Sequence, residues 1–515
     1  MSLVNSFPSG MTPRRLQVKA LESIEEGLKG PKKHIVLRAP TGSGKSAIAA
    51  TVSRFFNSQG GSYILCSRKY LQEQYLRDFS SLMTNFWGKS NYTCPIINRS
   101  CSGCPADQSK SSADYAMYLR TRCTDKKIGD KCPYISAKDK ALESNISLLN
   151  FEAFIANNLY GKEWPQRKVI IVDEAHNFCD RLAEQLAIPL PKAGVPRAKP
   201  HPSHSVRFPN LVKLKEFYEE ECRRKEMLGQ AYSKEELYVS LLEVYPRQDC
   251  WVSDGEHLKL YKVRDSINEY LSRMAEKVIW MSASITNSQC LELGLTAVNS
   301  VVIDLPSEFD LEDHPLRYRG GISVPKAHLM RGPADCRVAF KSIKDILEKE
   351  VFANHKRGIV HTHSYALAAA LRDGCSPIKG AKVLFHTDSK LAKEAVEAFT
   401  SKRVDWIVTP TLSEGFDGAG DMVQAQVILK TPWPSLASPK MKRMLNSTDF
   451  GKKLYRARTL STFIQSYGRG SRYKGDECVT YIIDRDFSRL LSGSWEDIPM
   501  WFRSVLTQGG FWEEG

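Results

Sequence analysis

Residues 39–46 of the chain read APTGSGKS, and this short loop restricts the fold more than any other stretch. It matches the pattern G-x-x-x-x-G-K-[ST], except that Ala39 stands where the first glycine is usual. An apolar run, HIVLRAP, precedes the loop, and SAIAATVSRFF follows it with helical spacing. A strand, a glycine loop and a helix in this order predict a P-loop that binds nucleotide, and an ordinary Gly/Ser loop is the alternative.

Each residue type in this loop has a chemical reason. Gly42 and Gly44 allow backbone N–H groups to surround phosphate oxygens, and the start of the next helix favours negative charge. Lys45 would reach the β- and γ-phosphates of ATP, and Ser46 would hold Mg²⁺. The predicted nucleotide-binding loop comprises Ala39, Pro40, Thr41, Gly42, Ser43, Gly44, Lys45 and Ser46.

Length and charge limit the possible classes of protein. A chain of 515 residues is too long for one hydrophobic core, so two large domains with insertions are expected. No apolar run reaches the length of a membrane span, and the first residues lack the apolar core of a signal peptide. Thirteen cysteines then indicate the cytoplasm or another reducing intracellular compartment. The formal net charge of +15 favours a polyanionic partner.

Short apolar strands alternate with amphipathic helices along most of the chain, as in GSYILCS followed by RKYLQEQYLRDFSSLM. Continuous apolar strands separated by helices predict an α/β fold with parallel sheets covered on both faces. Two stretches interrupt the alternation: residues 87–135 hold five cysteines, and residues 189–209 hold six prolines. A helical stretch and a hairpin turning at Asp254–Gly255 follow the prolines, so both stretches read as insertions into the first domain.

The second chemical motif is VIIVDEAH, in which a buried strand ends at Asp173. Ligands bind at the carboxyl edge of such sheets, where Asp173 can hold Mg²⁺ and Glu174 can activate the attacking water. A solvated strand end is the alternative for this motif alone. After a P-loop in the same domain, the acidic pair predicts hydrolysis of a nucleoside triphosphate.

The second half offers further candidates. In QSYGRGSR, residues 465–472, we expect Arg469 and Arg472 on one side of a helix, from which they could reach a γ-phosphate. A solvated basic helix face is the alternative. The loop TLSEGFDGAG, residues 411–420, follows a predicted strand and could couple the nucleotide state to a bound strand.

The order of these motifs resembles the superfamily 2 helicases and, more narrowly, the XPD/DinG group of DNA helicases. The resemblance rests on APTGSGKS, DEAH, WMSASIT, VHTHSY, SEGFD and QSYGRGSR, together with SLLNFEAF before DEAH and a cysteine cluster ahead of it. It implies two RecA-like motor domains with a cysteine-rich insertion and a small, arch-like helical insertion in the first. The expected first motor domain comprises 1–86, 138–188 and 269–300, with the insertions at 87–137 and 189–268, and the second motor domain comprises 301–515.

The same resemblance assigns roles to residues. Gln17 would read adenine, His176 and Ser282 would couple hydrolysis to the DNA, and the pair Arg469 and Arg472 would act as arginine fingers. Motif V is matched by Glu414, Gly415 and Asp417, and motif VI by Gln465, Arg469 and Arg472. The third motif reads SAS where SAT is usual, and the stretch between DEAH and this motif is short for an arch domain.

Five cysteines gather in the first insertion: Cys94, Cys101, Cys104, Cys123 and Cys132. Four thiolates can hold zinc or a [4Fe–4S] cluster, and spacing does not separate the two. The segments GKSNYTCP and KCPYISAKDKA resemble the first and last ligand segments of the family's iron–sulfur domain, which favours the cluster over zinc. The favoured ligands are Cys94, Cys101, Cys104 and Cys132, and five unligated thiols are the alternative.

Together these features predict a monomeric, ATP-dependent DNA helicase that uses Mg²⁺, moves along single-stranded DNA and opens forked duplexes, with no membrane partner. Polarity from 5′ to 3′ and a part in DNA repair, recombination or replication are implied by the resemblance alone. Two other classes stay open. One is an RNA or duplex-DNA translocase without strand separation, and the other is a nucleic-acid-binding scaffold with an idle ATP site.

Overall fold

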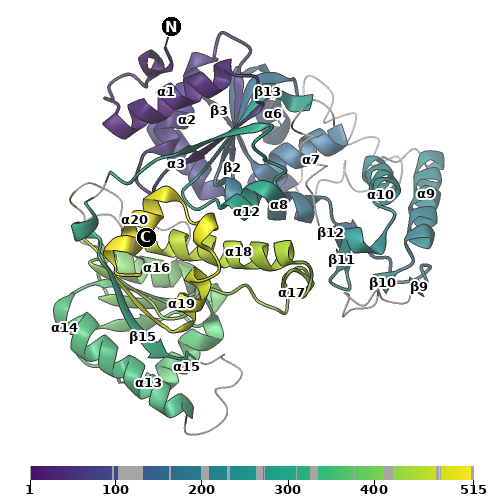
Figure 1. The fold of residues 1–515 in the computed structure, drawn as a ribbon. Coiled ribbons are helices and arrows are strands. Elements are labelled where there is room, and N and C mark those ends of the chain that lie inside the picture. The colour runs from purple at the N-terminus through teal and green to yellow at the C-terminus, as the bar shows by residue number, and fades with distance from the viewer. Residues whose placement is uncertain are drawn as a thin grey trace.

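The computed structural model describes residues 2–95, 98–101, 132–161, 164–198, 208–228, 232–261, 271, 273–308, 310–324, 335–375, 377–410, 422–470, 475 and 477–511. Within these ranges the chain forms two α/β units, each with a parallel sheet between layers of helices, and a lateral helical insertion (Figure 1). Among the described residues, no helix combines the length and the apolar character that a bilayer crossing requires.

The first sheet has seven strands, all paired in parallel. Their order is β14 (Ser300–Asp304), β1 (His34–Arg38), β13 (Ala275–Ser282), β7 (Arg167–Asp173), β2 (Ser62–Cys66), β6 (Ile146–Asn150) and β3 (Thr84–Phe86). Strands β1 and β2 are buried along their whole length, as their apolar sequences predict. We expected the first domain to end at residue 300, but the pairing of β14 with β1 extends its sheet to Asp304.

Helices cover both faces of this sheet. One core contains residues of α1 (Arg15–Lys29), α2 (Lys45–Phe55) and α3 (Lys69–Phe79). The core on the other face contains residues of α6 (Pro133–Glu143), α7 (Phe151–Gly161), α8 (Phe178–Gln185) and α12 (Asn287–Glu292). Since every strand of the central sheet points its carboxyl end to the same edge, the loops after β1 and β7 meet there.

The second sheet has six parallel strands. Their order is β15 (Leu316–Ile322), β20 (Val479–Asp484), β19 (Ala425–Ile428), β16 (Gly358–His361), β18 (Trp406–Thr409) and β17 (Val383–Phe385). Its helices are α13 (Asp335–Ile346), α14 (Phe352–Asn354), α15 (Tyr365–Cys375), α16 (Ala392–Thr400), α17 (Pro439–Asn446), α18 (Asp449–Tyr467), α19 (Asp486–Leu491) and α20 (Met500–Gln508). The fold class predicted from the sequence, two RecA-like units, is therefore confirmed.

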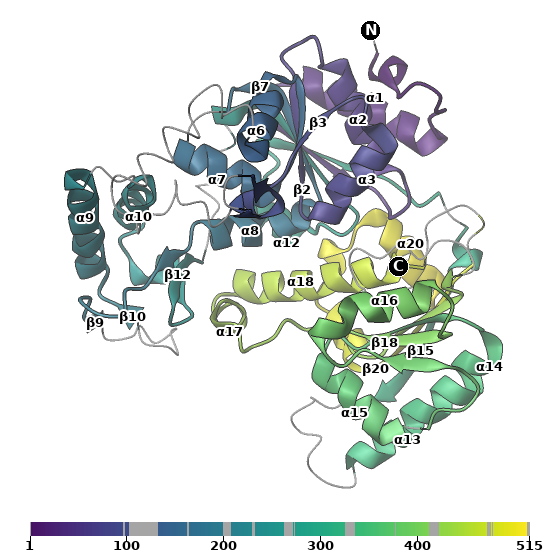
Figure 2. The same ribbon diagram turned by 180° about the vertical axis from the view of Figure 1, so that it is seen from behind.

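Both insertions have structure of their own. The first contains the two-stranded pair β4 (Thr93–Cys94) and β5 (Arg99–Ser100). The second contains β8 (Ile188–Pro189), β9 (Arg197–Ala198), β10 (Phe208–Pro209), α9 (Leu211–Met227), α10 (Ser233–Val244), β11 (Trp251–Ser253) and β12 (His257–Leu260). Strands β11 and β12 form the expected hairpin, and α9 and α10 lie at the outer end of the molecule in both views (Figures 1 and 2).

Candidate active site between the two domains

The predicted P-loop connects β1 to α2 at the carboxyl edge of the first sheet. Gly42 and Gly44 both have φ of 78°, a left-handed conformation that glycine adopts at little cost. A Cβ atom at Gly44 would lie 2.1 Å from Nε2 of Gln17, so a larger residue there would displace the Gln17 side chain. The loop therefore has the backbone shape and the close packing that phosphate binding requires.

Gln17, the predicted adenine-reading residue, lies directly against this loop. Its Nε2 donates to the carbonyl of Ser43 at 3.2 Å, and its Oε1 accepts from the backbone N–H of Arg14 at 2.9 Å. The guanidinium of Arg14 donates to the carbonyl of Gly42 at 2.8 Å. Residues at the start of α1 thus hydrogen-bond the loop carbonyls. The sequence analysis did not predict this role for Arg14. The adenine contact of Gln17 stays a prediction.

Lys45 and Asp173 face the same space in front of the loop. The Lys45 ammonium donates to the carbonyls of Ala39 and Pro40 at 3.2 and 3.1 Å. Burial and the charge of Glu174 raise the pKa of Asp173 to about 6, against the opposing effect of Lys45. A buried carboxylate, Asp173, beside the partly buried carboxylate of Glu174 is stabilised by a nearby cation, so these acidic side chains fit Mg²⁺.

A tyrosine that sequence reasoning missed belongs to the same group. The Tyr75 hydroxyl, on α3, donates to Oδ2 of Asp173 at 3.0 Å, and Ser46 lies within reach of it. Burial and the charge of Asp173 raise the pKa of Tyr75 well above its ordinary value, so the phenol stays protonated and remains a donor. It orients the carboxylate that is predicted to hold Mg²⁺. Its place in LQEQYL gave no signal beyond helical spacing.

Glu174 follows the end of β7 with φ of 53°, a strained conformation for a residue with a side chain. Its Oε2 lies 3.4 Å from Nδ1 of His176, and that ring nitrogen lies 3.0 Å from the Ser282 hydroxyl. Of the predicted coupling pair, His176 therefore contacts the predicted base directly, and Ser282 contacts His176. Burial alone would raise the pKa of Glu174, but the charges of His176, Lys45 and Arg469 lower it overall.

The second domain reaches Glu174 through α18. Nε2 of Gln465 donates to Oε2 of Glu174 at 3.3 Å and to the hydroxyl of Ser284 at 2.9 Å. The Ser461 hydroxyl, one turn earlier on α18, lies 2.9 Å from the same Ser284 hydroxyl. Motif VI thus contacts both the predicted base and the SAS segment of the first domain.

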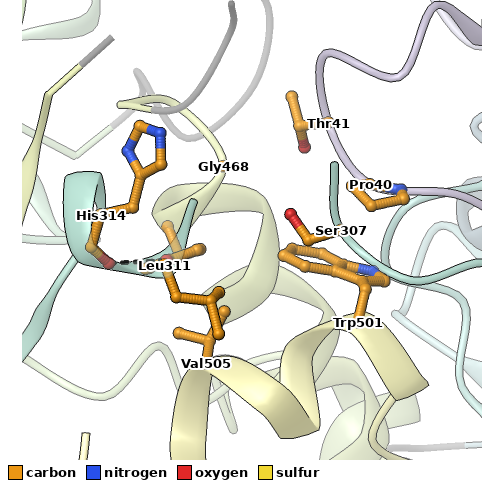
Figure 3. Close-up of a pocket in the computed structure, with 9 residues that line it drawn as sticks. Pro40, Thr41, Ser307, Leu311, His314, Gly468, Trp501 and Val505 are labelled. Atoms are coloured by element: carbon orange, nitrogen blue, oxygen red, sulfur yellow. Dashed lines mark hydrogen bonds between the residues drawn. The ribbon is translucent and has the colours of Figure 1, made fainter. Parts of the chain in front are cut away.

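The segment after α18 packs against the P-loop itself. A Cβ atom at Gly468 would lie 2.3 Å from Oγ1 of Thr41, so the two domains approach closely here. Pro40 and Thr41 line a small cavity together with second-domain residues that include His314 and Trp501 (Figure 3). We predicted that one helix would carry both Arg469 and Arg472. This prediction was wrong, because α18 ends at Tyr467. Arg469 follows in a turn, and its buried charge lowers the pKa of Glu174.

Several predicted residues lie outside the described ranges: Glu414, Gly415, Asp417, Arg472, Cys104 and Cys123. The other three clustered cysteines are described. Cys94 and Cys101 are buried beside the β4–β5 pair, and Cys132 immediately precedes α6. Tyr92 and Tyr134 have ring centroids 5.6 Å apart, so the two ends of the insertion meet.

Cys94 and Cys101 lie at the first end of this insertion and Cys132 at the last, and the Tyr92–Tyr134 contact brings these two ends together. Within the described residues, however, no three cysteine, histidine or acidic side chains form a metal-binding group. An iron–sulfur cluster therefore stays a proposal.

Comparisons with known proteins agree with this geometry. Residues 10–190 match the family model described as type III restriction enzyme, res subunit, and residues 347–505 match the helicase C-terminal domain. No curated protein matches the sequence.

Among solved structures, Xpd4 of S. tokodaii has a TM-score of 0.55 at 14% identity, with 93% of this chain and 97% of that chain covered. A structure titled XPD helicase has a TM-score of 0.58 at 16% identity, with 94% and 98% covered. A structure titled XPD apo has a TM-score of 0.53 at 15% identity, with 96% and 98% covered.

The family models place a helicase C-terminal domain in the second half of the chain, and the solved structures share the fold of two P-loop-type domains. The resemblance to superfamily 2 helicases of the XPD/DinG type is confirmed, whereas the iron–sulfur domain is not. The matched domains support a nucleic-acid helicase or ATPase that uses ATP and Mg²⁺.

Proposed function

We propose that the chain is an ATP-dependent DNA helicase that moves along single-stranded DNA and separates duplex strands at a fork. The observation that carries this proposal is the contact between Glu174 of the first domain and Gln465 of the second. ATP bound by the P-loop would lie between the two domains, so its hydrolysis would change the contacts that hold them together.

The residues of the site divide the chemistry between them. Lys45 would bind the β- and γ-phosphates, and Asp173, oriented by Tyr75, would hold Mg²⁺, whose positive charge would offset that of the phosphates. Glu174 accepts a proton from the attacking water, and its lowered pKa keeps it ionised at neutral pH. Arg469 offsets the negative charge that develops on the transferred phosphoryl group.

DNA is proposed over RNA because the order of the sequence motifs resembles that of the XPD/DinG group of DNA helicases. Polarity from 5′ to 3′, a part in repair, recombination or replication, a monomeric state and an intracellular location complete the proposal. The net charge of +15 supports a polyanionic partner, since phosphate contacts release counterions.

We also propose that the first insertion holds a [4Fe–4S] cluster, with Cys94, Cys101, Cys104 and Cys132 as the favoured ligands and zinc as the second choice. The burial of Cys94 and Cys101, and the contact of Tyr92 with Tyr134, support a compact unit at this place. Iron and acid-labile sulfide near four per chain would support the cluster. Stoichiometric zinc without iron would contradict it.

A direct test of the main proposal measures ATP turnover with single-stranded DNA, single-stranded RNA and blunt duplex DNA, alongside unwinding of forks with a 5′ or a 3′ tail. We expect stimulation by single-stranded DNA and unwinding from the 5′ tail. Glu174→Gln should remove both activities while the protein still binds ATP. Strong stimulation by RNA without fork opening would favour the translocase class, and absence of turnover would favour the scaffold class.

A further inference from the structure

Four charged side chains meet at the domain interface away from the P-loop. Asp180 on α8 and Glu292 on α12 come from the first domain, and Lys440 on α17 and Arg458 on α18 come from the second. Arg458 binds both oxygens of Glu292 at 2.8 Å and also binds Asp180. Lys440 donates to Asp180 at 2.7 Å and lies 3.8 Å from Glu292. We call these four residues the interdomain ion cluster.

Burial makes the Arg458–Glu292 pair dependent on both its members, whereas the Asp180 side chain is 41% exposed. The side chains of Arg458 and Glu292 are 10% and 8% exposed, so each would be costly to leave unpaired. Burial alone would raise the pKa of Asp180, but Arg458 and Lys440 lower it well below its usual range. Two carboxylates therefore balance two cations, and the guanidinium is oriented by donating through Nη2 to Glu292 and through Nη1 to Asp180.

The cluster is linked to the active site through α18. Arg458, Ser461 and Gln465 are spaced by three and four residues, so they lie along one side of this helix. Ser461 and Gln465 contact Ser284, and Gln465 also contacts Glu174. A shift of α18 at Arg458 would therefore move Gln465 relative to Glu174.

On the first-domain side, α12 follows Ser284 closely and ends at Glu292. The backbone N–H and hydroxyl of Ser288 donate to Asp497 at 2.6 and 2.9 Å, and Asn287 donates to the carbonyl of Glu496 at 2.6 Å. The second domain thus contacts both ends of α12: Asn287 and Ser288 at its start, and Glu292, which pairs with Arg458 of α18, at its end.

We propose that the interdomain ion cluster holds the two domains in the hydrolysis-competent arrangement, with Arg458 as a positioning residue that sets Gln465 against Glu174. This inference rests on the proposed ATP hydrolysis, and none of the four residues contacts the P-loop or the acidic pair in the part of the chain that the structure describes. Since the nucleotide-binding loop lies wholly in the first domain, loss of the cluster should reduce catalysis more than ATP binding.

The test compares Arg458→Gln and Glu292→Gln, singly and together, with Lys452→Ala as the matched control. Lys452 also lies on α18, but it is exposed and pairs only with Asp449 of its own helix among the contacts of described residues. We expect kcat for DNA-stimulated ATP turnover to fall about 100-fold in each glutamine variant, as a displacement near 1 Å at a catalytic group does. KM for ATP should change less than about threefold, and the double variant should resemble the single ones, because both remove the same pair.

A second measurement does not depend on turnover. Hydrogen exchange of α12 and α18 should become faster in Arg458→Gln and unchanged in Lys452→Ala, with Arg458→Lys intermediate in both exchange and kcat. A wild-type protein without turnover would defeat the proposed function but leave the exchange test able to support or reject the cluster. Wild-type kcat and wild-type exchange in a folded Arg458→Gln protein would overturn the inference.

Discussion

Replacing Gly468 by alanine tests whether the close approach of the two domains is needed for catalysis. The added Cβ would lie 2.3 Å from Oγ1 and 3.0 Å from Cβ of Thr41, whereas ordinary contact begins near 3.4 Å. Threonine has few alternative rotamers, and its own Cβ is fixed to the P-loop backbone, so a side-chain rotation does not relieve both contacts. The segment after α18 must therefore move away from the loop by about 1 Å, the difference between the first contact and an ordinary one.

A displacement of about 1 Å near reacting groups costs on the order of 100-fold in rate, which corresponds to about 2.7 kcal/mol in the activation free energy. We therefore expect kcat of Gly468→Ala to fall by about that factor. ATP binding should be nearly unchanged, because the P-loop, Gln17 and Lys45 all belong to the first domain. Steady-state ATPase kinetics and binding of a fluorescent ATP analogue measure the two quantities separately.

Two further variants make this test decisive. Gly30→Ala is the matched control, since its Cβ would meet only ordinary contacts, at 3.5 Å or more, and it should keep wild-type kinetics. Thr41→Ala combined with Gly468→Ala removes the 2.3 Å contact and should recover part of the lost rate relative to Thr41→Ala alone. Wild-type kcat in Gly468→Ala would refute the reasoning, because it would mean that hydrolysis does not use this domain contact.

Four other outcomes are expected. Lys45→Ala should abolish ATP turnover and leave single-strand binding largely intact, as gel-shift and ATPase assays would show. Cys132→Ser should lose iron and fork opening but keep part of the DNA-stimulated turnover, whereas Cys222→Ser on α9 should change neither; unwinding by an iron-free protein would contradict the role of the cluster. The affinity for single-stranded DNA should fall steeply with salt, by about 0.7 logarithmic units per tenfold salt for each phosphate contact. Burial lowers the pKa of His34 and His361 to about 4, so the unfolded chain binds more protons than the folded one below pH 6.5. The free energy of unfolding, measured with urea, should therefore be lower at pH 5 than at pH 7 by roughly 2 kcal/mol per histidine.

Much of the site could be predicted because its motifs are local. The strand before Asp173, the glycines of the P-loop and the position of Lys45 at the start of α2 follow from patterns a few residues long. Strand burial and left-handed φ values impose those patterns on any sequence that adopts this geometry. The helical insertion and its hairpin at Asp254–Gly255 were predicted for the same reason.

Short sequence patterns gave a wrong prediction where contacts with distant residues decide the course of the backbone. QSYGRGSR favours a continuous helix, yet α18 ends at Tyr467 and the chain turns at Gly468 and Gly470. A Cβ at Gly470 would lie 2.2 Å from Sγ of Cys478, on the segment leading into β20. The place where the helix ends is thus decided by the packing of the second sheet and of the P-loop.

The sequence by itself determined the two α/β units, the P-loop and the acidic pair at the end of β7, and the presence of insertions. Only the tertiary structure decided which of these residues touch. Gln465 and Glu174 are 291 positions apart, and Arg458 and Asp180 are 278 apart, so no periodicity links them. Tyr75 is equally invisible in the sequence as a partner of Asp173, since it lies on a different element. The physical reason is that hydrogen-bonded strands and helices restrict neighbours along the chain, whereas contacts between domains depend on how preformed surfaces fit together.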